Sequence, residues 1–175
     1  MIIFYGEEDG AIRGAKLDAL KAYFKQEGNA VAMNMLKNDS LSGSKSEKEY
    51  LIVNAHGNIA SFSGRDAEQL YNELRNKGLT NKRFSRIYLM ACNVGEQAQD
   101  NSIIDNFAKE FNQQVLMNNE TAGIGVYAPR GTLTYSISNT LMNGENVVKV
   151  TRVYIVDNMD HAEYTLDTGL LKVML

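Results

Sequence analysis

The stretch YLIVNAHGN, residues 50–58, joins an apolar run to a histidine, and IYLMACNVG, residues 87–95, joins a second run to the only cysteine. Continuous apolar runs of this length are typical of strands that are buried on both faces of a parallel sheet. In each stretch the reactive residue follows an alanine, just past the end of the run. The two stretches therefore predict two buried strands whose carboxyl ends carry His56 and Cys92.

The segment between these strands has the spacing of an amphipathic helix. Within residues 65–77, one face would comprise Ala67, Leu70, Tyr71 and Leu74. Gly78 follows the last turn, where glycine commonly ends a helix. Ser63 and Asp66 precede it and predict its amino-terminal cap. A helix here is the crossover that two neighbouring parallel strands require.

The rest of the first 120 residues continues this alternation. We expect strands at residues 2–5, 30–36 and 114–117, and helices at residues 11–26 and 102–111. The polar segment 37–49 predicts a loop and is the best candidate for a mobile or cleavable segment. This order of elements predicts an α/β fold with a mostly parallel sheet that is covered by helices.

The pattern changes in the last third of the chain. Residues 121–175 contain longer, alternating segments that predict antiparallel hairpins, which extend or cap the sheet. We therefore expect one domain over residues 1–175, with an α/β core at 1–120 and a β-rich extension at 121–175.

Composition narrows the class of protein. The net charge is −3 at pH 7, so no basic face for nucleic acid is expected. No apolar run approaches the roughly 20 residues that span a bilayer, and the opening MIIFYG is too short for a signal peptide. A single cysteine forms no internal disulfide. We expect a soluble protein, cytoplasmic or secreted as an effector into a reducing compartment, of unknown oligomeric state.

The chemistry of the two strand ends follows from their residue types. A free thiol has a pKa of about 8.5, and a neighbouring imidazole can accept its proton and later protonate a leaving amine. Backbone N–H groups of Gly57 and Cys92 could form an oxyanion hole. We expect the ring and the sulfur to lie within about 4–7 Å and the thiol to react readily at about pH 6.

Structural explanations compete with this hypothesis. A lone buried cysteine is usually a small hydrophobic residue, and a lone histidine is usually structural. Their matched positions at two strand ends favour catalysis. His161 lies beside acidic residues but lacks enough ligands of suitable geometry for a metal, so we expect a surface residue and no metal site.

These motifs resemble the caspase-like superfamily (clan CD) of cysteine peptidases. Within it, the chain is most similar to the autoprocessing cysteine protease domains of large clostridial glucosylating toxins and RTX-type toxins, in the stretches 54–95 and 127–137 of a match that covers residues 50–137. The shared features are a Phe-x-Gly pattern at residues 62–64 and a helix with spaced leucines, here preceded by Asp66 and containing Leu70 and Leu74. The resemblance implies a bacterial, toxin- or effector-related cysteine endopeptidase with a caspase-like fold.

The resemblance also suggests substrate-binding residues. Arg130 would bind an acidic side chain, as an arginine does in caspases, although a surface arginine is commoner. Asn93 would line the substrate cleft, although a turn uses the same residue type. Ser63 is the third candidate. Asp9, after the first strand, is the candidate for a third catalytic residue.

Two departures from the toxin domains concern activation and cleavage. Those domains are activated by inositol hexakisphosphate, which is held by a late cluster of cations; after Tyr127 this chain offers Arg130, Lys149, Arg152 and Lys172. Six phosphates need many charge-assisted contacts, so we expect no required cofactor and disfavour this activator. Those domains are cut upstream of themselves, but here the first strand begins at Ile2, so we expect cleavage in trans or a nick within residues 37–49. Because those domains favour leucine before the cut, the expected nick follows Leu41.

Three functions therefore stay open. The first is a peptidase with Cys92 as nucleophile and His56 as acid and base, acting on a peptide or protein substrate. The second is a catalytically silent caspase-like module that binds a protein partner, since a fold does not fix a function. The third is a small-molecule hydrolase that uses the same two residues.

Overall fold

A computed structural model describes residues 1–6, 10–96 and 106–174. Its main sheet has six strands in the order β2-β1-β3-β4-β5-β9. Their bounds are Val31–Ala32 (β2), Ile2–Phe4 (β1), Glu49–Asn54 (β3), Phe84–Met90 (β4), Gly125–Pro129 (β5) and Leu170–Lys172 (β9). All pairs are parallel except β5 with β9. The predicted mostly parallel α/β sheet is confirmed.

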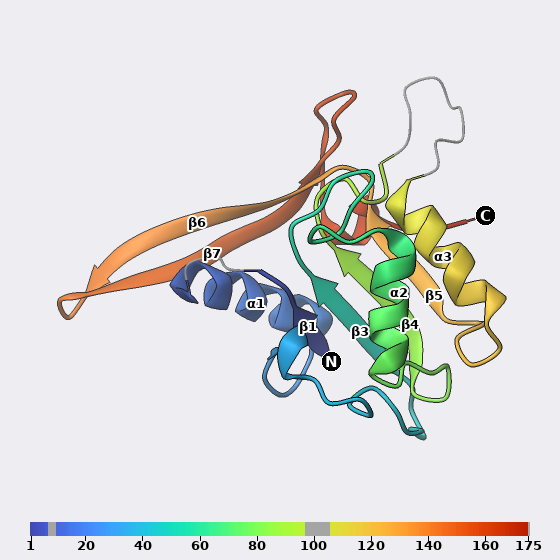
Figure 1. Cartoon of the computed structure of the whole chain (residues 1–175). Coiled ribbons are helices and arrows are strands. Elements are labelled where there is room, and N and C mark those ends of the chain that lie inside the picture. Colours follow the sequence, from blue (N-terminus) through green and yellow to red (C-terminus); the bar gives the residue numbers. More distant parts are fainter. Residues whose placement is uncertain (7–9, 97–105, 175) are drawn as a thin grey trace.

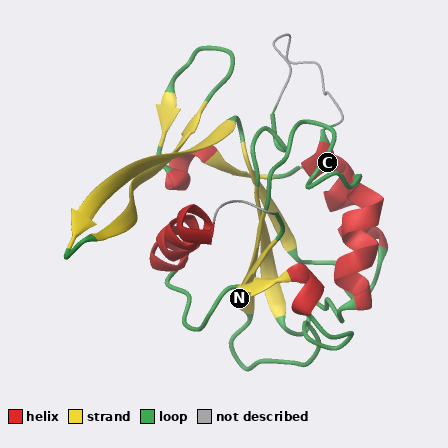
Figure 2. Cartoon of the chain, turned by 60° about the vertical axis from the view of Figure 1, so that its left-hand side comes forward, coloured by secondary structure: helices red, strands yellow, loops and turns green. Residues whose placement is uncertain are grey.

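Helices cover both faces of this sheet (Figures 1 and 2). Helix α1 (Gly10–Phe24) lies on one face, and α2 (Ala67–Asn76) and α3 (Phe107–Met117) lie on the other. The predicted apolar face of α2 is buried, and Asp66 caps it by accepting the N–H of Gln69. Within the described part of the chain, no helix is long and apolar enough to cross a membrane.

The strand order brings the two motifs together. Strands β3 and β4 are direct neighbours, and Asn54 pairs with Met90 at their last residues. The N–H of Ala55 then donates to the carbonyl of Met90 at 3.3 Å. The segments that follow β3 and β4 therefore leave the sheet side by side at the same edge. As the sequence predicts, His56 and Cys92 lie at the carboxyl ends of adjacent strands.

A second, antiparallel sheet comprises β6 (Thr132–Met142), β7 (Glu145–Val156) and β8 (Glu163–Tyr164). Strands β6 and β7 form a long ribbon that reaches past the body of the molecule (Figure 1). Asn143 and Gly144 connect them with φ of 51° and 79°, the backbone that Asn-Gly hairpin turns favour. The base of the ribbon packs into the core, and a short helix, α4 (Leu166–Gly169), links β8 to β9.

Two strand predictions are wrong. Residues 30–36 form a strand only at Val31–Ala32, followed by a 3₁₀ turn over Met33–Met35. Residues 114–117 belong to α3, where Val115 is buried on the same face as Phe107 and Phe111. A short apolar run fits a strand or a helix equally well. The helical spacing of Phe107, Phe111 and Val115 assigns this one to a helix. Residues 102–105 of the expected helix lie outside the described residues.

The predicted loop at residues 37–49 forms, but it is anchored. Leu41 is fully buried, and its N–H donates to the carbonyl of Lys77. Arg83 donates to the carbonyl oxygens of Ser40 and Ser42 at 2.8 and 3.2 Å. Cleavage after Leu41 is therefore not supported, because proteolysis requires an exposed segment that is free of such bonds.

Candidate active site

A small pocket of about 80 Å³ lies at the carboxyl edge of the main sheet. Its floor comes from the ends of β3 and β4, and its walls come from the end of β1, from α1 and from β6. The lining residues are Tyr5, Arg13, Lys16, Asn54, Ala55, His56, Ala91, Cys92, Leu133 and Tyr135. Both sequence-predicted catalytic residues therefore line one cavity.

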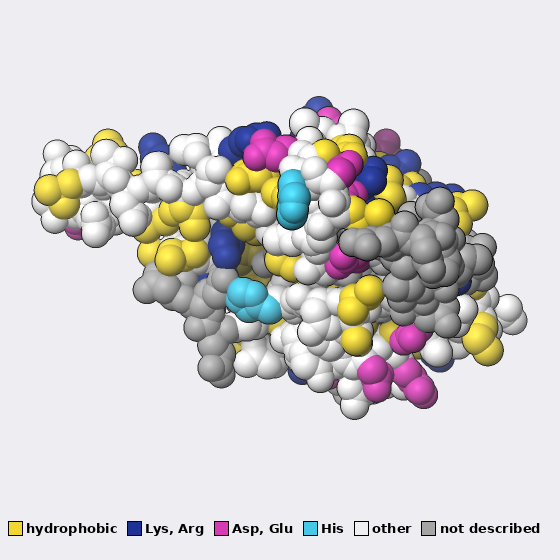
Figure 3. All heavy atoms as spheres, turned by 90° about the horizontal axis from the view of Figure 1, so that it is seen from above, with side chains coloured by type: hydrophobic (Ala, Val, Ile, Leu, Met, Phe, Trp, Pro, Cys, Tyr) yellow, Lys and Arg dark blue, Asp and Glu magenta, His cyan; other side chains and the backbone are white. Residues whose placement is uncertain are grey.

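His56 is presented by a short hairpin-like loop after β3. Its carbonyl accepts the N–H of Ser63 at 2.7 Å, and Gly57 forms an antiparallel bridge with Phe62. Phe62 is fully buried and fastens this loop to the core. The imidazole is exposed, and both histidines of the chain reach the face that is seen from above in Figure 3. The loop thus holds His56 at the mouth of the pocket.

Cys92 is half-buried in the turn after β4. Its thiol donates to the carbonyl of Leu133 at 3.5 Å, and the next residue, Asn93, donates its N–H to Gly131. Burial raises the pKa of the Cys92 thiol, and the backbone bond at Leu133 and the charge of Lys16 oppose this without offsetting it. This direction opposes the expected reactivity of the thiol at about pH 6, which stays a prediction for alkylation to test.

This raised pKa predicts how alkylation depends on pH. Because the thiolate is the nucleophile, iodoacetamide should modify native Cys92 more slowly than a model thiol at about pH 6, with the rate still rising above the free-thiol pKa of about 8.5. Mass spectrometry of quenched time points measures the rate. A native rate above that of the model thiol at low pH would contradict the burial effect.

Gly57 packs the histidine loop against the cysteine turn. A Cβ at this position would lie 2.8 Å from the Ala91 Cβ and 2.9 Å from a methyl of Val94. Glycine at 57 and alanine at 91 therefore allow the two strand ends to approach closely. This packing explains both small residues without any catalytic role, and the expected oxyanion-hole role of Gly57 stays a prediction.

Replacing Gly57 with alanine should separate the two loops. Overpacking of this kind costs about 1–3 kcal/mol of folding free energy, and the displaced loop should carry His56 away from Cys92. Urea unfolding measures the first effect. Gly10→Ala, at the first residue of α1, is the control for the loss of a glycine, since nothing lies within 4 Å of its added Cβ and its φ is not positive. Equal stability of Gly57→Ala and wild type would contradict the close packing.

The three predicted substrate-binding residues do not line this pocket. Asn93 uses its side-chain oxygen to accept bonds from Thr132 and Asn158. Arg130 pairs with Asp157 at 2.9 Å and lies over the ring of Tyr164. Ser63 lines a larger cavity of about 900 Å³ next to β1 and α2, which adjoins the small pocket at Tyr5 and Arg13. Each is engaged elsewhere in the folded chain.

Sequence reasoning missed the contribution of α1. Arg13 and Lys16, one turn apart, bring two cations to the pocket. Lys16 lies 5.1 Å from the ring centre of Tyr135. The three-residue spacing is visible in the sequence, but only the tertiary fold places this polar face over the strand ends. Asp9, the expected third catalytic residue, lies outside the described residues.

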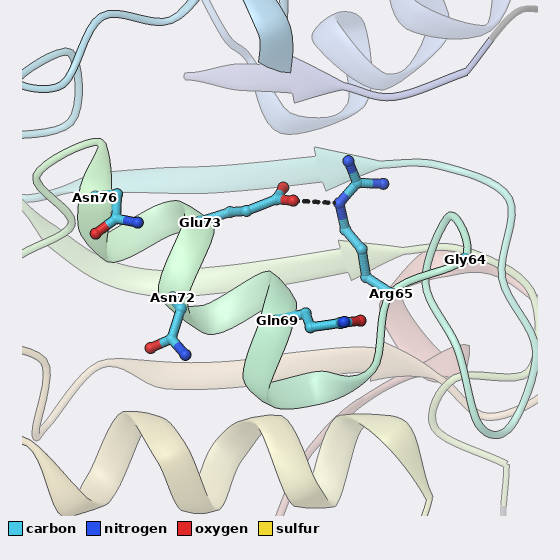
Figure 4. Close-up of a pocket in the computed structure, with 6 residues that line it drawn as sticks. All are labelled: Gly64, Arg65, Gln69, Asn72, Glu73 and Asn76. Carbon is cyan, nitrogen blue, oxygen red and sulfur yellow. Dashed lines mark hydrogen bonds and ion pairs between the residues drawn. The ribbon is translucent and has the colours of Figure 1, made fainter.

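A third, shallower pocket of about 470 Å³ runs along α2 (Figure 4). Arg65 donates to Glu73 at 2.6 Å, and Gln69 accepts the N–H of Asp66 as part of the helix cap. These bonds stabilise α2 and explain the polar lining. The part of the chain that the structure describes contains no group of three or more His, Cys, Asp or Glu residues that could hold a metal ion.

A comparison with known protein families assigns the chain to one of them. A family model described as a domain of unknown function (DUF8616) matches residues 23–143, which include both β3 and β4. The match covers more than half of the chain, so the chain belongs to this family. A comparison with curated proteins gives no match.

Proposed function

We propose that this protein is a cysteine endopeptidase with a caspase-like fold and a Cys92–His56 dyad. One observation carries the proposal: the chain's only cysteine and a histidine 36 positions earlier leave adjacent parallel strands and line the same pocket. In open α/β sheets this edge is where ligands bind. A purely structural cysteine does not require a histidine beside it.

The reaction follows from these positions. Cys92 Sγ bonds to the substrate carbonyl carbon while its proton passes to the His56 ring, which acts as general base. The C–N bond then breaks, His56 returns the proton to the departing amine, and water hydrolyses the thioester. Because burial holds the thiol in its protonated form, proton removal by His56 is an essential part of the first step. Backbone N–H groups of Gly57 and Cys92 stabilise the oxyanion.

The substrate is a peptide or protein segment, and the role is toxin- or effector-related. The resemblance favours leucine before the scissile bond, whereas Arg13 and Lys16 in the pocket favour an acidic residue. No cofactor is required. Inositol hexakisphosphate stays disfavoured, because Arg130 and Arg152 already pair with Asp157 and Glu163.

Matched fluorogenic peptides test this proposal, one series with leucine and one with aspartate before the reporter group. We expect release by wild type and none by Cys92→Ala. Release by both proteins at the same rate would indicate a contaminant and remove the support for a peptidase. Faster cleavage of the aspartate series would assign specificity to the cations of α1.

A protein-binding module without catalysis is the second candidate. It is favoured by the protonated state of the Cys92 thiol and by its contact with the Leu133 carbonyl, both of which suit a structural cysteine. In that case Cys92→Ala would lower the stability of the fold but keep partner binding, and no peptide would be cleaved.

A further inference from the structure

A second surface lies on the α1 side of the sheet, toward the amino-terminal ends of β3, β4 and β5. Tyr50 pairs in register with Arg86, and Tyr88 pairs with Tyr127. Each of the four therefore has a neighbour on the adjoining strand. Tyr50 lies four residues before the end of β3, about 13 Å along the strand from the candidate active site. The surface is thus separate from the pocket.

Arg86 is held in place by tyrosines. Its guanidinium carbon lies 5.1 Å from the Tyr50 ring centre and 5.3 Å from that of Tyr127. It also donates to the hydroxyl of Tyr88 at 3.2 Å. The side chain is nevertheless exposed. Three aromatic neighbours thus fix the guanidinium while part of it still faces solvent.

Arg86 differs from most arginines of the chain. Arg65, Arg75, Arg83, Arg130 and Arg152 each form an ion pair with a carboxylate. Among residues 1–6, 10–96 and 106–174, Arg86 forms no ion pair, and its guanidinium bonds to or lies over three tyrosines. A fixed, exposed guanidinium that pairs with no carboxylate of its own chain is well suited to bind a carboxylate of another molecule.

Lys172 adds a second cation to this surface. It pairs in register with Tyr127, and Gly125 pairs with Arg86. A Cβ at Gly125 would lie 3.2 Å from the Tyr127 ring and 3.9 Å from the Lys172 Cε, so the tyrosine ring and the lysine stem both lie beside this glycine. Tyr50, Arg86, Tyr127 and Lys172 are called the tyrosine–arginine surface below.

We propose that the tyrosine–arginine surface binds an acidic segment of a partner protein, with Arg86 holding a carboxylate. The charge of the surface complements such a segment, and tyrosine and arginine are the residues that dominate binding energy at protein interfaces. Two cations on a chain of net charge −3 are too few to hold a phosphate backbone. This binding does not depend on the proposed peptidase activity.

Fluorescence anisotropy with a fluorescein-labelled hexaglutamate peptide tests the proposal on the full chain. Wild type should bind saturably, and Arg86→Gln should weaken binding at least about tenfold. Arg86→Lys should not restore it, because lysine lacks the planar fork. Lys172→Gln should weaken binding less. Arg75→Gln, which removes the same charge from α2, should bind as wild type does.

Three results would overturn the proposal. The first is no saturable binding up to about 1 mM peptide, the affinity range of the weakest specific contacts. The second is an equal loss in Arg75→Gln and Arg86→Gln, which would mean attraction to net charge alone. The third is tighter binding of labelled hexathymidylate, which would assign the surface to single-stranded nucleic acid. Circular dichroism confirms that each variant is folded.

Discussion

Cys92→Ala is expected to lower kcat/KM for a leucine- or aspartate-containing peptide by at least about 10³-fold, and His56→Ala by about 10²–10⁴-fold. The thiol supplies the bond to the carbonyl carbon, and the imidazole removes a proton that burial holds on the sulfur. Because the two side chains act as one unit, the double variant should be no slower than Cys92→Ala alone.

The chain offers a matched control for the histidine. His161 is the only other histidine, is exposed, and lies in the turn after β7. His161→Ala should therefore leave kcat/KM unchanged. If both histidine variants reduce activity equally, the loss does not come from the proposed dyad. If neither does, His56 is not the general base.

Phe62→Ala is expected to destabilise the fold by about 3–5 kcal/mol, the cost of deleting a fully buried phenylalanine. Its ring stacks on Phe107 with centres 5.6 Å apart and meets Tyr5 edge-on at 6.1 Å. The same residue bridges to Gly57, so its loss should also release the loop that carries His56. Urea unfolding and peptide cleavage measure the two effects.

Phe84→Ala separates stability from site geometry. Phe84 is also fully buried, but it lies at the start of β4, far along the strand from Cys92. The two variants should lose similar free energy, and only Phe62→Ala should lose cleavage per folded molecule. Equal cleavage by both variants would show that the His56 loop does not depend on Phe62.

The sequence was most informative where patterns were long and unambiguous. Strands β3 and β4 and helix α2 have continuous apolar runs or a clear 3.6-residue period, and Asp66 and Gly78 mark the ends of α2. These elements suffice to predict that His56 and Cys92 lie at adjacent strand ends. The four apolar or polar residues at 114–117 are too few to show a 3.6-residue period. Only the buried face of α3, which includes Val115, shows that they are helical.

Tertiary contacts explain the remaining differences. Arg130 could not be assigned from the sequence because its partner, Asp157, lies 27 residues away on another element. Leu41 is surrounded by polar residues in the sequence but packs into the core beside α2. The raised pKa of Cys92 likewise comes from burial in the folded chain, where its thiol meets Leu133 of β6, forty-one residues later in the sequence.

The most direct test of the dyad is covalent labelling of the native protein with a leucine-containing peptidyl acyloxymethyl ketone, followed by intact-mass and peptide mass spectrometry. The dyad predicts a single adduct on Cys92, much slower labelling of His56→Ala, unchanged labelling of His161→Ala, and loss of labelling in urea. Labelling of wild type, His56→Ala and unfolded protein at the same rate would contradict it, because Cys92 would then react as an ordinary thiol.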